Sequence, residues 1–342
     1  MRKKRFAAAL SVACALALLL FVFYPREHKF QTSVAGLFDT HITFTAYARN
    51  EREFIKYAEI VYDELEYLHR LFDAYNYYEG INNLALLNGF AGAEAVAVDG
   101  ALMELLLFGR AAYDETRGTL NIALGPVTAL WKAARENGTP PSADELTGAG
   151  RFTNIHDIVI DETDNTVFIR QNGMRIDVGS VAKGFAAERA MRKAEDAGLR
   201  AGLLDAGGNV TAVGSPPHGE NGAWIIGILD PVKKSDGANG LIGTLSIENR
   251  SVVSSGAYER YFIADGIRYG HIIDPSTLFP ADGYAGVTII HDDSGVADML
   301  STALFILPVR EGEALAAKWN AGAVWIFHDG TVHATEGVTI VK

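Results

Sequence analysis

The chain has 342 residues, of which 49% are hydrophobic, 35 are glycine and one is cysteine, and its formal net charge is −12. This composition indicates a folded, loop-rich globular protein and excludes extensive disorder. Because an acidic surface repels a phosphate backbone, nucleic acid is excluded as a partner. The one cysteine, Cys14, lies in the N-terminal apolar run, which excludes a catalytic thiolate or a disulfide in the rest of the chain.

Residues 1–26 have the features of a targeting element. Four basic residues at positions 2–5 precede Phe6–Tyr24, a run of 19 residues without a charge, which is close to the span of a bilayer. No clear cleavage site follows, so the sequence favours an uncleaved membrane anchor over a cleaved signal peptide or a lipidated Cys14. The basic residues should stay in the cytoplasm, which places the body outside the cytoplasm, on the periplasmic side of the cell membrane.

The body is predicted to be mixed α/β (α+β), a single two-lobed domain at 35–342 with β-sheets flanked by helices, after a tether at 27–34. Strand-like alternation at 41–48 precedes helical spacing of apolar residues over 51–75 and 100–118. Residues 165–214 predict strand, turn, helix and strand, and short strands are expected over 223–264. Two helices, at 296–308 and 310–322, and two strands, at 323–329 and 337–342, are expected to complete the chain.

The segment His271–Gly283 predicts a held loop. Its two prolines, Pro275 and Pro280, fix backbone angles and remove amide donors, so the segment cannot be an ordinary helix or central strand. Held loops that carry His and Asp often carry chemistry. A polar turn that closes a hairpin explains the same residues equally well.

A second segment, 175–190, predicts an anion site. Asp177 is expected to end a strand, and Gly179 and Ser180 to begin a helix, where free amides and the charge of Lys183 can hold an anion. The alternative is a simple strand-to-helix turn with Ser180 as the helix cap. The glycine pair at 207–208 and the turn at 254–256 are equally open to either a ligand-binding or a purely structural interpretation.

Asp298 and Thr302 lie four residues apart in a predicted helix, so they share one face. That face is otherwise apolar, and a buried Asp298 needs a partner, for which a hard cation held by oxygen ligands is suitable. A helix cap or a surface carboxylate is the alternative. Zinc is disfavoured, since the chain has no H-x-x-x-H, H-E-x-x-H or cysteine pair.

Seven segments, in this order, resemble one family, the ApbE family of FAD:protein FMN transferases, over about residues 35–341. The first four are FDAYNYYEGINNLALLN, LNIALGPVTALW, IDVGSVAKGFAAE and LLDAGGNVTAVG. The last three are SVVSSGAYERYF, HIIDPSTLFP and ADMLSTALFIL. The family motifs that they match include F-D-x-Y, F-D-P-T-x-G-P, A-K-G-Y, T-S-G-x-Y-E-R-Y and H-I-I-D-P-R-T-G.

The resemblance implies transfer of the FMN half of FAD to a Thr or Ser hydroxyl of an acceptor flavoprotein, with Mg²⁺ and release of AMP. The expected acceptor is a flavoprotein domain of a respiratory electron-transfer complex. His271 and Asp298 would be catalytic, His271 by proton transfer or phosphate orientation. The implied metal ligands are Asp298, Thr302, Ser301 and main-chain oxygen around Ser180. The implied FAD contacts are Tyr75, Thr119, Leu120, Asn121, Asp177, Lys183 and Ile272.

Three positions depart from the family pattern. Asn121 replaces an Asp, Ser276 replaces the Arg of D-P-R-T-G, and Leu278 replaces its Gly. The loss of the Arg removes a phosphate partner, and the loss of the Gly restricts the backbone of the turn. Two alternatives stay open at this point: an Mg²⁺-dependent FAD pyrophosphatase at the same site, and a flavin-binding module without chemistry.

Overall fold

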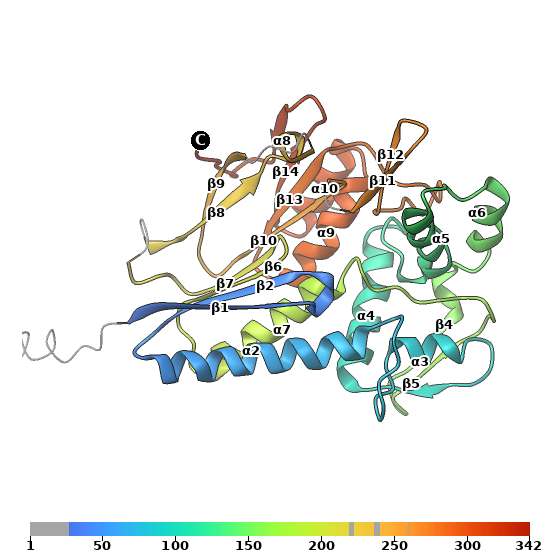
Figure 1. The fold of residues 1–342 in the computed structure, drawn as a ribbon, viewed down its shortest axis with the longest axis horizontal. Helices are drawn as coiled ribbons and strands as arrows, with labels where there is room; N and C mark the ends of the chain where they lie inside the picture. The colour runs from blue at the N-terminus through green and yellow to red at the C-terminus, as the bar shows by residue number, and fades with distance from the viewer. Residues whose placement is uncertain (1–26, 219–221, 236–239, 259) are drawn as a thin grey trace, which may run out of the picture.

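The fold is built around an eight-stranded sheet (Figure 1). The structure is a computed structural model that describes residues 27–218, 222–235, 240–258 and 260–342. The strand order is β1-β2-β6-β7-β10-β13-β14-β15, and every neighbouring pair is antiparallel. The strands are β1 (His28–Ala35), β2 (His41–Ala48), β6 (Gly202–Ala206), β7 (Asn209–Val213), β10 (Ser251–Gly256), β13 (Gly286–His291), β14 (Gly322–Ile326) and β15 (Val332–Ala334).

Both faces of this sheet are covered. Helices α2 (Glu51–Phe72), α7 (Ala182–Asp196) and α9 (Ser294–Ile306) pack on one face. The hairpin of β8 (Trp224–Leu229) and β9 (Leu241–Ile247) covers part of the other, where Trp224 and Ile226 belong to the same hydrophobic cluster as Val210 of β7. Strand β7 is therefore buried along its whole length. Helices α8 (Pro231–Ser235) and α10 (Val309–Lys318) lie near the sheet's C-terminal strands.

A second, smaller lobe is inserted between α2 and α7 (Figure 1). It contains α3 (Leu84–Gly89), β3 (Val96–Ala97), α4 (Gly100–Glu115), η2 (Ile122–Leu124), α5 (Gly125–Asn137), α6 (Ala143–Gly150), η3 (Ile155–Asp157), β4 (Ile158–Asp161) and β5 (Thr166–Ile169). Strands β3, β5 and β4 form a three-stranded sheet in that order. Leu102 and Val167 of this lobe belong to the same hydrophobic core as Phe44 and Leu304 of the sheet lobe. One continuous core thus fixes the two lobes to each other, and the predicted mixed α/β, two-lobed architecture is confirmed.

Two further elements border the region between the lobes. The short helix η1 (Leu37–Asp39) follows β1, and a two-stranded hairpin of β11 (Tyr261–Ala264) and β12 (Ile267–Gly270) turns at Asp265 and Gly266. Both turn residues have positive φ, 52° and 77°, as an Asp-Gly hairpin turn requires. The hairpin leads directly into His271.

The predicted tether at 27–34 is wrong. Residues His28–Ala35 form β1, which pairs along its whole length with β2. Phe30, Thr32 and Val34 are the half-buried members of its alternation, and the ring of Phe30 stacks on Phe54 with centroids 5.3 Å apart. The alternation typical of an edge strand was present, but three polar residues on the solvent face, Lys29, Gln31 and Ser33, made the segment resemble a linker.

Three predicted boundaries also need correction. Helix α2 ends at Phe72 rather than at residue 75, because Asp73 Oδ1 accepts the amides of Tyr75 and Asn76 and turns the chain away. The expected strand ending at Asp177 is an extended segment without a strand partner among the described residues. The last expected strand, 337–342, makes one isolated bridge, between Val341 and Thr244, whereas the terminal strand is β15.

Among the described residues, none of the helices is both long and apolar enough to cross a membrane. The predicted anchor, residues 1–26, lies outside the described residues.

Candidate functional site

A cleft of about 710 Å³ lies between the two lobes. Its walls come from η1, the loop after α2, the η2–α5 junction, residues 177–183, the β6–β7 turn, the β11–β12 hairpin and α9. Eleven of the twelve residues to which the sequence assigned a role line it: Tyr75, Thr119, Leu120, Asn121, Asp177, Ser180, Lys183, His271, Ile272, Asp298 and Thr302. Residues as far apart in the chain as Tyr75 and Thr302 are therefore collected at one place.

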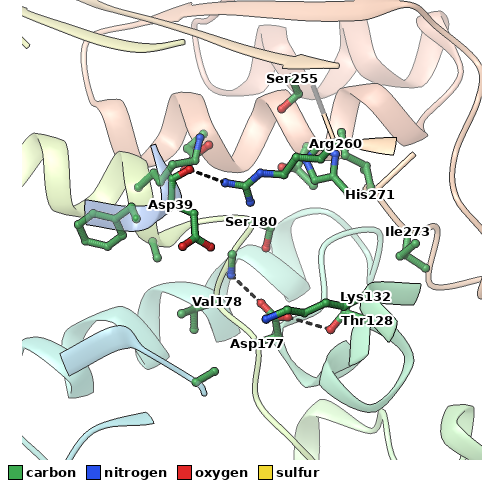
Figure 2. Close-up of a pocket in the computed structure, with 18 of the residues that line it drawn as sticks. Asp39, Thr128, Lys132, Asp177, Val178, Ser180, Ser255, Arg260, His271 and Ile273 are labelled. Carbon is green, nitrogen blue, oxygen red and sulfur yellow. Dashed lines mark hydrogen bonds between the residues drawn. The ribbon is translucent and has the colours of Figure 1, made fainter. Parts of the chain in front are cut away.

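Asp177 is held rigidly on the floor of this cleft (Figure 2). Thr128 donates its hydroxyl to Oδ2 at 2.8 Å, and the amide of Gly179 donates to Oδ1 at 2.9 Å. The backbone is fixed as well, because Asp177 N–H donates to the Ile122 carbonyl at 2.8 Å. The side chain of Asn88 takes the place of a neighbouring strand, bonding both the N–H and the C=O of Ile176.

Tyr75 presents an aromatic ring beside Asp177. The ammonium of Lys132 lies 3.4 Å from the ring centroid, and the guanidinium of Arg175 lies 5.7 Å from it. Both distances are within the range of cation–π attraction. Burial, together with the negative charge of Asp177, raises the pKa of Tyr75 to about 12, so the phenol stays protonated at neutral pH. Tyr75 is 48% exposed, so its ring is available to stack on a planar ligand.

Asp298 stands on α9 with 4% of its surface exposed. Its Oδ2 accepts the amide of Gly184 at 2.8 Å, and burial raises the pKa of Asp298, while the nearby charge of Lys183 opposes that rise. Thr302, one turn further along α9, is half-buried and also lines the cleft. The sequence prediction that both side chains share one face is confirmed, and the surface-carboxylate alternative for Asp298 is wrong.

Ser301 is the predicted site residue that does not line the cleft. It is fully buried, and its hydroxyl donates to the Asp298 carbonyl at 2.9 Å and shares a 2.8 Å hydrogen bond with Ser255. Ser255 does reach the cleft. Ser301 thus lies behind the wall, where it joins α9 to the end of β10.

Free backbone amides were expected at the start of α7, but most of these amides already donate a hydrogen bond within the protein. The amides of Gly179 and Gly184 donate to the carboxylates of Asp177 and Asp298, and those of Val181 and Ala182 donate to the Val178 carbonyl. Ser180 does not cap the helix, whose cap position is Val181. An anion in this cleft would be held chiefly by side-chain cations.

Among the described residues, four cations are available for that purpose: Lys132, Arg135, Lys183 and Arg260. They balance the four carboxylates in the described part of the lining, Asp39, Asp73, Asp177 and Asp298. That part of the cleft is formally neutral on a chain of net charge −12. Arg260 also donates to the Asp39 carbonyl at 3.3 Å, across the cleft from η1 (Figure 2).

His271 lies among three of these cations. Desolvation within the cleft, and the charges of Arg260, Lys183 and Arg135, lower the pKa of His271 to about 4. The side chain remains exposed to the solvent of the cleft. The imidazole is therefore neutral at physiological pH and can accept a proton, as a weaker base than an ordinary histidine.

The loop after His271 is closed by backbone hydrogen bonds. Ile273 forms a bridge with Pro280, Asp274 N–H donates to the Phe279 carbonyl at 2.9 Å, and Leu278 N–H donates to the Asp274 carbonyl at 2.8 Å. Trp131 fixes the loop from the other lobe by donating to the Leu278 carbonyl at 2.8 Å. The held-loop prediction is confirmed.

The structure gives each departure from the family pattern a local role. Ser276 bonds Asp274 through both its amide and its hydroxyl, and it is not among the cleft-lining residues. Leu278 keeps the left-handed conformation of a glycine, with φ 64°. Asn121 caps η2 and donates Nδ2 to the Thr153 carbonyl at 2.9 Å, a bond that an Asp cannot make.

Comparisons with known proteins identify the family of this chain. Residues 38–326 match the model of the ApbE family. The chain is 34% identical over 242 residues to the FAD:protein FMN transferase of Klebsiella pneumoniae strain 342, covering 70% of this chain and 73% of that protein. It is 35% identical over 268 residues to the enzyme of that name from Treponema pallidum, covering 75% and 73%.

Solved structures show the same fold. The crystal structure of the ApbE protein from Thermotoga maritima is similar with a TM-score of 0.81 and 28% identity, over 90% of this chain and 97% of that one. The flavin transferase ApbE from Vibrio cholerae matches in fold with a TM-score of 0.75 at 21% identity, over 91% and 98%. By fold and by sequence, the chain belongs to the ApbE family.

Proposed function

We propose that this chain is an FAD:protein FMN transferase that links FMN to a Ser or Thr hydroxyl of an acceptor flavoprotein. The hydroxyl oxygen bonds to the FMN phosphorus, the bond from that phosphorus to the AMP oxygen breaks, and AMP leaves. The observation that carries the proposal is the cleft itself, which gathers Asp177, Lys183, His271 and Asp298 at one place. Its volume, about 710 Å³, lies in the upper part of the roughly 300–1,000 Å³ range of ligand pockets.

The residues present fit a magnesium ion. Asp298 is a buried carboxylate in need of positive charge, and Thr302 and the backbone around Ser180 add oxygen donors at the same wall. The described residues contain no cluster of three His, Cys, Asp or Glu. One carboxylate plus neutral oxygens, with phosphate and water completing the shell, is typical of Mg²⁺. The ion would neutralise charge on the pyrophosphate and stabilise the departing AMP.

The protein's own side chains would bind and orient FAD and would deprotonate the acceptor hydroxyl. Tyr75, with Lys132 behind its ring, offers a stacking surface for a flavin or adenine ring. Lys183 and Arg260 supply positive charge for phosphate oxygens. His271, neutral because its pKa is about 4, is the group that would take the acceptor hydroxyl's proton during attack.

The setting of the reaction is part of the proposal. The uncharged run Phe6–Tyr24 after four basic residues supports a single N-terminal anchor with the catalytic body outside the cytoplasm. A membrane-tethered body suits acceptor flavoprotein subunits of respiratory electron-transfer complexes. Protease treatment of intact spheroplasts tests this placement: the body should be digested, whereas a protected body would place it in the cytoplasm.

The activity is tested by incubating the protein with FAD, Mg²⁺ and a flavin-acceptor domain. Fluorescence that remains on the denatured acceptor, together with free AMP, is the expected result. Free FMN and AMP without labelled acceptor would mean hydrolysis, and unchanged FAD would mean binding alone. Asp298→Ala should abolish turnover; undiminished Mg²⁺-dependent activity would refute the metal assignment.

A further inference from the structure

Helices α7 and α9 hold each other's first turns through two carboxylates. Asp298 of α9 accepts the amide of Gly184 in α7 at 2.8 Å. Glu188 of α7 accepts the amide of Ser294, the first residue of α9, also at 2.8 Å. Gly184 and Glu188 are one helical turn apart, and so are Ser294 and Asp298. The two hydrogen bonds and the two turns therefore close a ring, which we call the reciprocal brace.

The two helices have no room to shift within this brace. A Cβ atom on Gly184 would lie 2.3 Å from the Ser294 carbonyl oxygen and 2.5 Å from the Asp298 Cβ. Ser294 is fully buried, and its hydroxyl donates to Asn209 Oδ1 of β7 at 2.7 Å. With the backbones in contact, the side chain of Glu188 adds a hydrogen bond at the residue where α9 begins.

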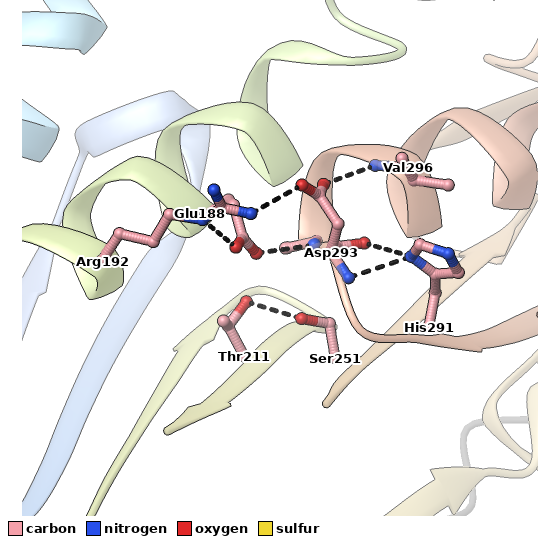
Figure 3. Close-up of polar contacts among 8 residues, drawn as sticks. Glu188, Arg192, Thr211, Ser251, His291, Asp293 and Val296 are labelled. Carbon is pink, nitrogen blue, oxygen red and sulfur yellow. Dashed lines mark hydrogen bonds and ion pairs between the residues drawn. The ribbon is translucent and has the colours of Figure 1, made fainter. Parts of the chain in front are cut away.

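Glu188 forms the outer end of the brace (Figure 3). Its side chain is 16% exposed and receives Arg192 Nε on Oε1 at 2.6 Å, while Oε2 takes the Ser294 amide. Arg192 also reaches Asp293, whose Oδ1 caps α9 through the Val296 amide. Arg192 is 63% exposed, and exposed ion pairs contribute little. The Ser294 amide bond is thus the contact through which Glu188 holds the start of α9.

We propose that Glu188 is a positioning residue for the reaction: by fixing the start of α9, it sets where Asp298 and Thr302 stand in the cleft. Glu188 does not itself line the cleft. The inference rests on the proposed function, in which Asp298 and Thr302 face the divalent ion. Loss of a residue that orients such ligands typically weakens ion affinity by about 10–100-fold.

Three substitutions of Glu188 separate the contributions of its side-chain length, its charge and its packing. Glu188→Ala removes the acceptor, Glu188→Asp keeps the charge but withdraws the carboxylate by one methylene, and Glu188→Gln keeps an acceptor oxygen at the original reach. Arg192→Ala is the matched control, because it removes the exposed ion pair and leaves the Glu188–Ser294 bond. Each full chain, in detergent with FAD bound, is titrated with Mn²⁺ by electron paramagnetic resonance, and FAD affinity is measured separately in EDTA.

Glu188→Ala and Glu188→Asp should weaken Mn²⁺ binding by about tenfold or more and lower kcat, with ion-free FAD affinity unchanged. Glu188→Gln and Arg192→Ala should stay within about threefold of wild type. If Glu188→Ala does not fold, the contrast between the Asp and Gln variants decides.

Two results would overturn the inference. If Glu188→Asp leaves Mn²⁺ affinity unchanged, even with a lowered Tm, this inference is overturned while the proposed function stands. Glu188 would then be purely structural. A wild-type protein that binds no Mn²⁺ would overturn the proposed function and this inference with it.

Discussion

The imidazole of His271 is surrounded by the desolvating cleft and the cations Arg260, Lys183 and Arg135, which lower its pKa to about 4. A base with a lowered pKa stays unprotonated until the pH falls toward that value. The value of kcat/KM reports on the free enzyme. Protonation of His271 should therefore not lower kcat/KM between about pH 7.5 and pH 5.5, and should lower it only below about pH 5. Imidazole NMR titration, with His271→Gln to assign the signal, measures this pKa directly. An apparent pKa near 6.5 would contradict the electrostatic account.

Leu278 affects the stability of the protein in two opposite ways, through its backbone conformation and through its packing. Its φ of 64° is a conformation that costs a non-glycine residue about 1 kcal/mol. The side chain contributes packing in return, beside Trp131 and against Gly150, where an added Cβ would lie 2.7 Å from Leu278 Cδ1. Leu278→Ala loses the packing and keeps the strain, whereas Leu278→Gly loses both. The Gly variant should thus be the more stable of the two by about 1 kcal/mol in urea unfolding; the opposite order would show that the turn carries no strain.

Among the secondary-structure elements, the close contact between α7 and α9 predicts the effect of adding a methyl group at Gly184. Gly184→Ala places a methyl group against the Ser294 carbonyl at 2.3 Å, so the helices must separate, at a cost of about 1–3 kcal/mol. Gly148 in α6 is the matched control, because an added Cβ meets nothing within 4 Å. Gly148→Ala should be neutral or stabilising by up to about 1 kcal/mol. Equal effects of the two substitutions on Tm would contradict the observed packing of α7 on α9.

Other elements show where sequence patterns were sufficient and where they failed. Helix α2 was found because Phe54, Val61, Leu65 and Leu68 repeat at helical spacing and are buried. The segment ending at Asp177 looked like a strand because its alternation is correct. Its hydrogen-bond partners, however, are the Asn88 side chain and the Ile122 carbonyl, and no local pattern reveals partners so distant in the chain.

At the scale of the whole molecule, the site residues in ordered motifs could be predicted, and those outside them could not. Asp298, His271 and Asp177 stand in short segments whose spacing is distinctive. Lys132 and Arg135 resemble ordinary charged residues on a helix, and only the packing of α5 beside residues 175–183 brings them to the cleft. The failed expectation of free amides at α7 has the same origin, because Asp298, which occupies the Gly184 amide, lies 114 residues away.

The reaction proposed for this cleft is the transfer of FMN from FAD to a protein hydroxyl. The most direct test is the reaction with FAD, Mg²⁺ and the acceptor domain in ¹⁸O-labelled water, followed by mass spectrometry of all products. We predict an acceptor that carries FMN on one Ser or Thr, an equimolar amount of AMP, and no ¹⁸O in either product. Free FMN that carries ¹⁸O, beside an unmodified acceptor, would show that water is the nucleophile and would contradict the claim.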